Sequence, residues 1–134
     1  MIEFLLKEAL SFHAQLDAAA GIRDIGLVES AIESPFQTFD GQELYPTIFD
    51  KAARLFYGLT QNHGFVDGNK RVALHTTEIF LRVNNFVLHC SEDELVDIGL
   101  KIAKGLLTVD EIKFWLLRNV AGTIFITGNI TIKI

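Results

Sequence analysis

The chain has 134 residues, of which 49% are hydrophobic and 22% are charged, so it can build the core of one folded domain and is not disordered by composition. The formal net charge of −5 argues against bulk, sequence-independent binding to nucleic acid, although it leaves room for a local cationic pocket. Because Cys90 is the one cysteine, an intrachain disulfide is excluded and a reducing cytoplasm is indicated, with a reactive thiol as the alternative.

The N-terminal segment is predicted to form an amphipathic helix that ends at Gly21. Its apolar part contains Glu3 and Lys7, so it is unlike a signal peptide, and no apolar run in the sequence approaches the length needed to span a membrane. The apolar positions at helical spacing are Ile2, Leu5, Leu6, Ala9, Phe12 and Leu16.

A short helix and a hairpin are predicted next. Asp24 can cap a helix that runs to Ser34, where Pro35 terminates it. The following stretch, "FQTFDGQELYP", has Asp40-Gly41 at its centre, and this dipeptide favours a tight hairpin turn because both positions tolerate positive φ. We therefore predict a two-stranded flap, consisting of Phe36, Gln37, Thr38, Phe39, Asp40, Gly41, Gln42, Glu43, Leu44 and Tyr45.

Two longer helices follow, separated by a polar loop at residues 63–68. The first is predicted to start at Thr47 and to run to about Asn62, and the second to run from about Asn69 to Asn84. The positions expected to face the core are Ile48, Ala52, Leu55, Phe56 and Leu59 in the former and Val72, Ala73, Thr76, Ile79, Phe80 and Val83 in the latter.

Two capping boxes predict the last helices. Ser91 with Glu94 opens a helix that ends at Gly105, and Thr108 with Glu111 opens another. The apolar positions of the last helix are Ile112, Trp115 and Leu116.

The C-terminal tail, "TIFITGNITIKI", alternates with period two around Gly128-Asn129, a pattern that favours a second β-hairpin. Its edge would be free either to pair with another chain, such as a second copy of this protein, or to cover an edge of the domain itself. The sequence thus predicts an all-α domain of about six helices with a small flap, residues 1–122, followed by the tail, residues 123–134.

The candidate functional site is the polar segment "HGFVDGNKR" at residues 63–71. A helix that begins directly after a glycine-containing loop exposes unpaired backbone N–H groups, which together with the helix dipole bind anions. Gly68 lets the backbone approach a bound group, and Asn69 adds an amide donor. Lys70 and Arg71 add charges suited to phosphate oxygens, so the four residues predict a polyphosphate site.

Two further residues of this segment carry chemistry. Asp67 is its one carboxylate and is suited to Mg²⁺, which commonly accompanies a polyphosphate and prefers oxygen ligands. His63 can take a proton from an attacking hydroxyl, and Phe65 is expected to pin the loop on the core. Together these are the parts of a phosphoryl or nucleotidyl transferase. Taken singly, each has a plainer interpretation as a helix cap, a turn or a solvated charge.

Other polar residues are given structural interpretations. His75 and Arg82 share a helix face with Arg71, and either extend the cationic pocket or form a stripe that faces solvent or a partner. Arg23 is expected to pair with Asp24. The remaining histidines, treated as structural, are His13 and His89.

The same segment resembles the signature of Fic-domain proteins, His-x-Phe-x-(Asp/Glu)-(Gly/Ala)-Asn-x-Arg, and with Lys70 in the variable position it is most similar to the death-on-curing (Doc) branch. The stretches "GIRDIGLVESAIESPFQTF", "YPTIFDKAARLFYGL" and "RVALHTTEIFLRVNNF" also resemble that family. The likeness covers about Gly21 to Phe86 well and the last two helices loosely, and it does not extend to the tail.

The resemblance implies a helical fold with a flap over a site that uses ATP and Mg²⁺ to modify a hydroxyl of a target protein. By matching position, His63 would be the general base and Asp67 the magnesium ligand. The flap would pair with an extended segment of the target by strand addition. The residues implied to hold phosphates are Gly68, Asn69, Lys70 and Arg71.

Two departures separate the chain from the AMP-transferring majority of that family. Lys70 stands where the majority has Gly, and Leu74 stands where it has a second Arg. Both departures match the Doc branch, which implies transfer of the γ-phosphate, with a threonine of elongation factor Tu as the branch's known target. AMP transfer by the same residues and a non-catalytic interaction module remain the alternatives.

The sequence lacks the (Ser/Thr)-x-x-x-Glu-(Gly/Asn) motif with which many Fic proteins silence themselves. The resemblance therefore implies a toxin whose control comes from a separate antitoxin, a segment of which folds on the toxin.

Overall fold

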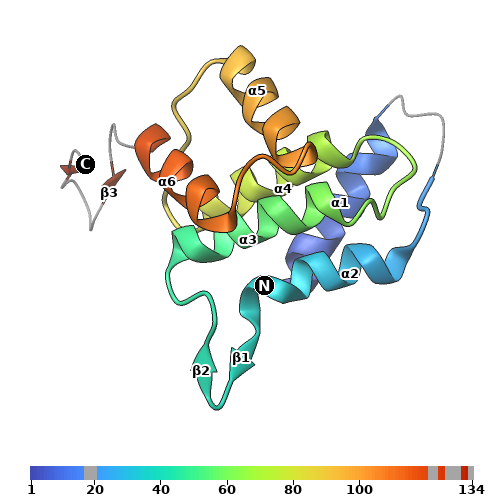
Figure 1. Cartoon of the computed structure of the whole chain (residues 1–134), viewed down its shortest axis with the longest axis horizontal. Helices are drawn as coiled ribbons and strands as arrows, with labels where there is room; N and C mark the ends of the chain where they lie inside the picture. Colours follow the sequence, from blue (N-terminus) through green and yellow to red (C-terminus); the bar gives the residue numbers. More distant parts are fainter. Residues whose placement is uncertain (17–20, 121–123, 126–130, 133–134) are drawn as a thin grey trace.

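The computed structural model describes residues 1–16, 21–120, 124–125 and 131–132 (Figure 1). Within these residues the fold is all-α with small antiparallel hairpins, as predicted. No helix in this part of the chain is long and apolar enough to cross a membrane. The helices are α1 (Ile2–Gln15), α2 (Ile25–Glu33), the 3₁₀ turn η1 (Ser34–Phe36), α3 (Ile48–Gln61), α4 (Asn69–Val83), α5 (Glu92–Ala103) and α6 (Val109–Asn119). The strands are β1 (Thr38–Phe39), β2 (Gln42–Glu43), β3 (Ile124–Phe125) and β4 (Thr131–Ile132).

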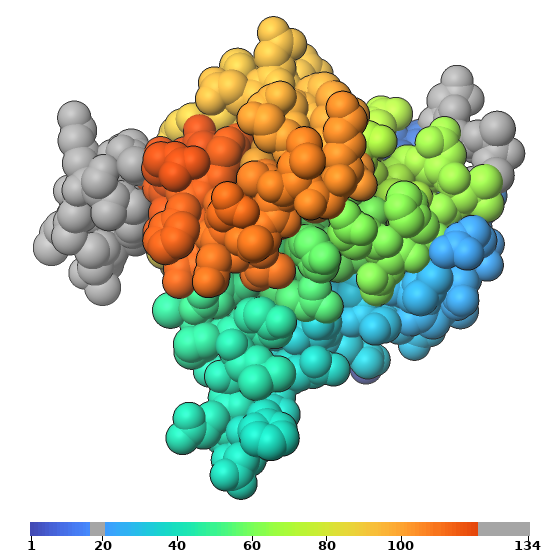
Figure 2. Space-filling view, in the orientation of Figure 1, coloured from blue at the N-terminus to red at the C-terminus, as the bar shows by residue number. Residues whose placement is uncertain are grey.

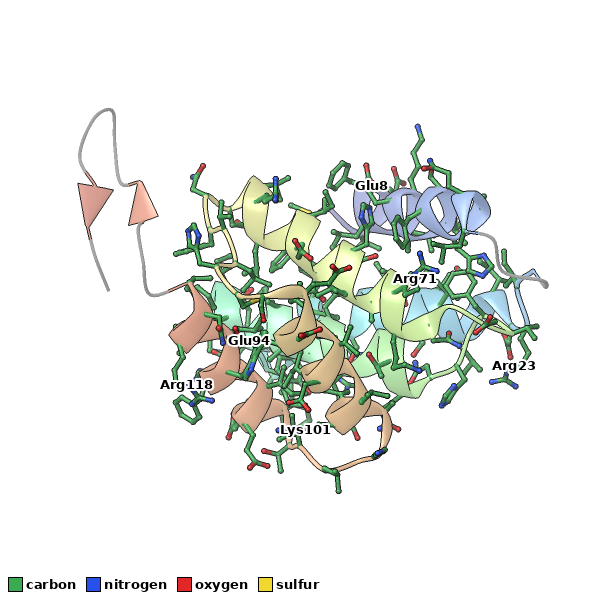
Figure 3. All side chains as sticks on the ribbon, turned by 90° about the horizontal axis from the view of Figure 1, so that it is seen from above. Glu8, Arg23, Arg71, Glu94, Lys101 and Arg118 are labelled. Carbon is green, nitrogen blue, oxygen red and sulfur yellow. The ribbon has the colours of Figure 1, made fainter. Side chains whose placement is uncertain are left out.

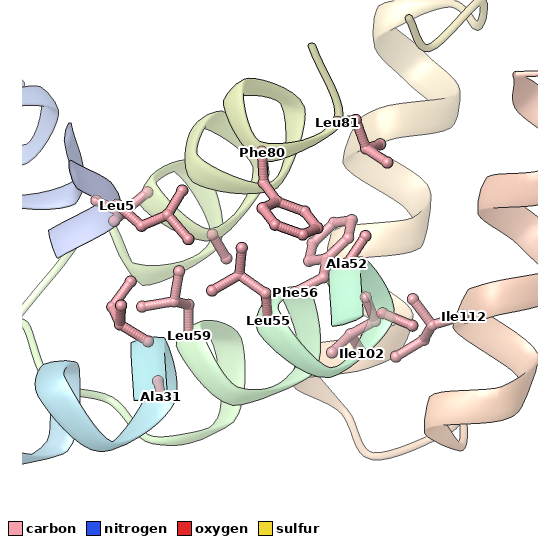
Figure 4. Packing of buried hydrophobic residues seen from close by; sticks show 14 of the residues in the cluster. Leu5, Ala31, Ala52, Leu55, Phe56, Leu59, Phe80, Leu81, Ile102 and Ile112 are labelled. Atoms are coloured by element: carbon pink, nitrogen blue, oxygen red, sulfur yellow. The ribbon is translucent and has the colours of Figure 1, made fainter. Parts of the chain in front are cut away.

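Helix α3 lies at the centre and contacts α2, α4, α5 and α6, while α1 packs on α2 and α4 (Figures 1 and 4). The predicted inward face of α3 is confirmed at its four central positions, whereas Ile48, in the first turn, is half-buried and Phe49 is buried beside it. Large side chains from five helices meet around α3; among those that Figure 4 labels are Leu5, Leu55, Phe56, Leu59, Phe80, Leu81, Ile102 and Ile112.

Two details of the predicted helices are corrected. Helix α1 ends at Gln15 rather than at Gly21, because Leu16 adopts extended backbone angles and its N–H bonds to the carbonyl of His13 at 3.1 Å. Val83 is 48% exposed rather than buried, because it is the last residue of α4 and the inward face of that helix finishes at Phe80 and Leu81. Helix α4 also buries Val72, Ala73, Thr76 and Thr77, and Ile79 is half-buried.

Local sequence signals fix most other boundaries. Both predicted capping boxes are formed, at Ser91–Glu94 and Thr108–Glu111, and a further box, Thr47–Asp50, opens α3 at the predicted start. Asp24 caps α2 by accepting from the N–H of Gly26 at 2.9 Å. The chain then passes through η1, which contains Pro35.

The flap is a hairpin that projects from the helices beyond the N-terminal end of α3 (Figure 2). Asp40 (φ 53°) and Gly41 (φ 77°) form its turn in the left-handed conformation predicted for them. At its base, the buried Lys51 donates to the carbonyl of Tyr45 and lies 3.0 Å from a carboxylate oxygen of Glu43, so β2 is tied to α3. The predicted tail hairpin is confirmed by the antiparallel pairing of β3 with β4, while its turn at 128–129 lies outside the described residues.

Asp50 joins the start of α3 to α6. Its carboxylate accepts from Thr47 and lies 3.0 Å from Nζ of Lys113. Burial by itself would raise the pKa of Asp50, but the hydrogen bonds from Thr47 and Lys113 and the charge of Lys113 outweigh it and lower that pKa from its ordinary value of 3.8. The stabilisation from Asp50 is therefore present above this ordinary value and is lost as the pH falls through the lower pKa of the folded state.

We expect Asp50→Asn to lower the free energy of unfolding at neutral pH by about 1 kcal/mol, because a charged cap and an ion pair are lost. The difference between variant and wild type should shrink as the pH is lowered below about 4, where the wild-type carboxylate takes up a proton. Urea unfolding of both proteins over a series of pH values measures this, and a gap that stays constant into the acid range would contradict it.

Candidate active site

The loop between α3 and α4 is held along the connection between α1 and α2. The carbonyl of Gly64 accepts from the backbone N–H groups of Arg23, at 2.9 Å, and Asp24, at 3.0 Å. The N–H of Val66 donates to the carbonyl of Gly21 at 3.2 Å, next to an antiparallel bridge between Ile22 and Phe65. This main-chain clamp fixes the loop before α4 begins.

Side-chain contacts also hold the loop between α3 and α4 against the core. Phe65 is 2% exposed and stacks on the ring of His13, with ring centroids 4.0 Å apart, so it pins the loop to the core as predicted. His13 Nε2 lies 3.0 Å from the carbonyl oxygen of Asp67, to which it donates. The amide of Asn69 bonds to both backbone groups of Phe65, at 3.1 and 2.8 Å. The side chain of Asn69 thus shapes the loop, and its backbone N–H and the second hydrogen of its amide are the donors left for a ligand.

The start of α4 is shaped to receive an anion. Gly68 is the N-cap in the left-handed conformation (φ 87°), which favours glycine, and a Cβ there would lie 3.0 Å from Cδ1 of Leu16, so that side chain would have to shift. No side chain of the described residues caps α4. The first-turn N–H groups of residues 69–71 therefore point outward without an intrahelical partner.

The six predicted site residues line one pocket of about 290 Å³. His63 lies at its edge in the left-handed conformation (φ 51°) and is exposed, as are Asp67, Lys70 and Arg71. The other lining residues are Gly68, Asn69, Thr60, Val66 and Ala103. A histidine, a carboxylate, two cations and a helix N-terminus therefore line a single cavity.

Asp67 is the carboxylate of this pocket, and its Oδ1 accepts from the N–H of Gly68 at 2.8 Å. Among the described residues no group of three or more His, Cys, Asp or Glu side chains is gathered as a metal site. A magnesium ion held here would therefore have one carboxylate from the described residues, and the role of Asp67 as its ligand stays a prediction.

The flap does not contribute to the lining of this pocket. It stands at the N-terminal end of α3, whereas the loop follows the C-terminal end, and a helix of that length spans about 20 Å (Figure 1). The role of residues 36–45 in target docking stays a prediction. An extended segment of the target would have to run along α3 to contact both the flap and the pocket.

His75 and Arg82, on α4, line a separate groove of about 750 Å³ between α1, α4 and α5. His75 stacks on Phe12, with centroids 4.1 Å apart, and pairs with Glu8 at 3.3 Å. Arg82 and Arg71 line the same groove together with acidic residues. The face of α4 that carries Arg71, His75 and Arg82 is therefore neither a simple extension of the cationic pocket nor fully solvated.

Cys90 lies half-buried in the same groove. Burial, followed by the charges of Glu94 and Glu78, raises the pKa of its thiol, which disfavours the thiolate. The structure thus gives no support to the alternative of a reactive thiol.

Arg23 does not make the predicted pair with Asp24, because the carboxylate of Asp24 is used in capping α2. Its guanidinium instead donates to the carbonyl oxygens of His63, at 2.7 Å, and of Asn62, at 3.4 Å. In Figure 3, Arg23 is labelled beside this loop and Arg71 on α4. The sequence signal that could have pointed to this role is the position of Arg23 in the family-like "GIRD" stretch.

Comparison with known proteins identifies the family. The model of the Fic/DOC family matches residues 3–81, so the chain belongs to this family. It is similar to Toxin Doc of Mycolicibacterium smegmatis, with 42% identity over 72 residues. That alignment covers 54% of this chain and 55% of the relative, so the match spans about half of either protein.

The fit of Gly64 provides a test of the clamp. A Cβ at Gly64 would lie 2.4 Å from Cγ2 and 3.0 Å from the backbone nitrogen of Val28, so Gly64→Ala should push the loop off α2. We expect a loss of about 1–3 kcal/mol in the free energy of unfolding, as for other overpacked sites. The matched control is Gly21→Ala, where an added Cβ meets nothing within 4 Å. Equal stability of the two variants, measured by urea unfolding, would show that the loop is not held as described.

Proposed function

We propose that this chain is a Doc-like toxin that transfers the γ-phosphate of ATP to a hydroxyl group of a target protein. The observation that supports this most directly is the convergence of His63, Lys70, Arg71 and the uncapped start of α4 on one pocket. The relative named Toxin Doc supports the assignment to a toxin–antitoxin pair, with a separate antitoxin as partner.

Binding would rest on the start of α4. The N–H groups of residues 69–71 would donate to phosphate oxygens, and Gly68, with no side chain, would allow that approach. Lys70 and Arg71 would offset the charge that develops during transfer. Asp67 would hold Mg²⁺, which when bound neutralises charge on the phosphate oxygens.

His63 would act as the general base. Its imidazole accepts the proton of the target hydroxyl, whose oxygen forms a bond to the γ-phosphorus. The bond from that phosphorus to the β–γ bridging oxygen breaks, and ADP leaves with the electron pair. Because His63 is exposed at the pocket, a side chain presented by another protein can reach it.

The finer assignments come from the Doc branch. We propose a threonine of a cytoplasmic protein, such as elongation factor Tu, as the acceptor. The exposed strands of the flap, β1 and β2, would add a strand of the target. Transfer of AMP is the alternative, and Lys70 weighs against it because this side chain lines the space beside the start of α4.

Labelled ATP separates these functions. We expect a bacterial lysate incubated with the protein, Mg²⁺ and ATP to acquire label from the γ position and not from the α position. His63→Ala should reduce the rate by roughly 100-fold or more, since general-base catalysis is lost, while calorimetry still detects binding of ATP with Mg²⁺. His89→Ala is the control, because His89 is an exposed histidine outside this pocket.

Other results would contradict the proposal. Label from the α position alone would establish AMP transfer, and an active His63→Ala variant would remove the role of His63. Absence of both labelling and nucleotide binding would favour a non-catalytic interaction module.

A further inference from the structure

Arg23 is bound to the backbone of the loop that carries His63. Its Nε donates to the carbonyl of His63 at 2.7 Å and its Nη2 to that of Asn62 at 3.4 Å. Its own N–H donates to the carbonyl of Gly64 at 2.9 Å. One residue, 40 positions upstream of His63, therefore contacts three successive carbonyls at the C-terminal end of α3. That end of a helix has unpaired carbonyls and favours a cation.

The backbone of His63 needs such support. Its φ of 51° places a residue with a Cβ in the left-handed region, which is unfavourable for L-residues other than glycine. The neighbouring residues are already fixed, since the amide of Asn62 donates to the carbonyl of Leu27 at 3.1 Å and Gly64 packs against Val28. Within the described residues the imidazole of His63 has no hydrogen-bond partner, so the backbone of His63, which sets the direction of its Cα–Cβ bond, is the part that the surrounding residues hold.

We infer that Arg23 is a positioning residue, which holds His63 in the left-handed conformation and so directs its imidazole to the pocket. The inference rests on the proposed role of His63. Arg23 is exposed and does not line the pocket, so it acts on the base without touching the nucleotide. Because the main-chain bonds from Arg23 and Asp24 to Gly64 remain when the Arg23 side chain is changed, its removal should alter catalysis while the fold persists.

The first experiment compares kinetics of Arg23→Gln, Arg23→Lys and a control, Arg118→Gln, whose exposed side chain lies on α6 (Figure 3). We expect Arg23→Gln to lower kcat roughly tenfold to a hundredfold, as misplacement of a catalytic group does, with KM for ATP and the melting temperature unchanged. Arg23→Lys should recover part of kcat, because an ammonium can donate to the carbonyl of His63. Wild-type kcat in Arg23→Gln, or a loss explained by the unfolded fraction, would overturn the inference.

A second measurement does not depend on catalysis. NMR signals of the His63 ring should shift or broaden in Arg23→Gln and stay unchanged in Arg118→Gln, with His89 as the internal reference. Unchanged His63 signals in Arg23→Gln would overturn the inference even if the wild type transfers phosphate. A wild type without transferase activity, combined with shifted His63 signals, would refute the proposed function and leave the positioning by Arg23 supported.

Discussion

The site depends on the clamp that the α1–α2 connection places on the loop after α3. Within seven residues the chain must leave α3, turn and enter α4, and it passes through left-handed positions at His63 and Gly68. The main-chain bonds to Gly64 and the bond from His13 to Asp67 hold both turns in place. Each such bond contributes about 1 kcal/mol to stability, whereas a left-handed residue with a side chain, such as His63, costs about 1–2 kcal/mol. One bond therefore only offsets this cost, and several bonds together are needed to hold the loop.

This arrangement gives the N-terminal part of the chain a direct part in the site. Helix α1 supplies His13 beneath Phe65 and is followed by Leu16, which fills the space that a side chain at Gly68 would take. The loop is thus sandwiched between elements far upstream, and the start of α4 is left uncapped and open. The N-terminus of a helix, with its free N–H groups, is a general anion site, and the loop places His63 beside it.

Features with local signals could be predicted from the sequence, whereas features made by distant contacts could not. The capping boxes and the Asp40-Gly41 turn each depend on residues within four positions, and the helix interiors follow from periodicity. The partner of Arg23 lies 40 residues away, so proximity in sequence favoured Asp24 wrongly. The type of Asn69 predicts a donor to phosphate, which stays a prediction, whereas its bonds to the backbone of Phe65, which shape the loop, were not foreseen. The cluster itself was found because its polar residues are contiguous.

The central claim is that the start of α4 holds a nucleotide's phosphates beside His63. A crystal structure of the protein with Mg²⁺ and a non-hydrolysable ATP analogue tests it most directly. The account predicts phosphate oxygens within hydrogen-bond distance of the backbone N–H groups of residues 69–71, and the His63 imidazole facing the γ-phosphate. A nucleotide bound in another cavity, or a His63 ring turned away into solvent, would contradict it.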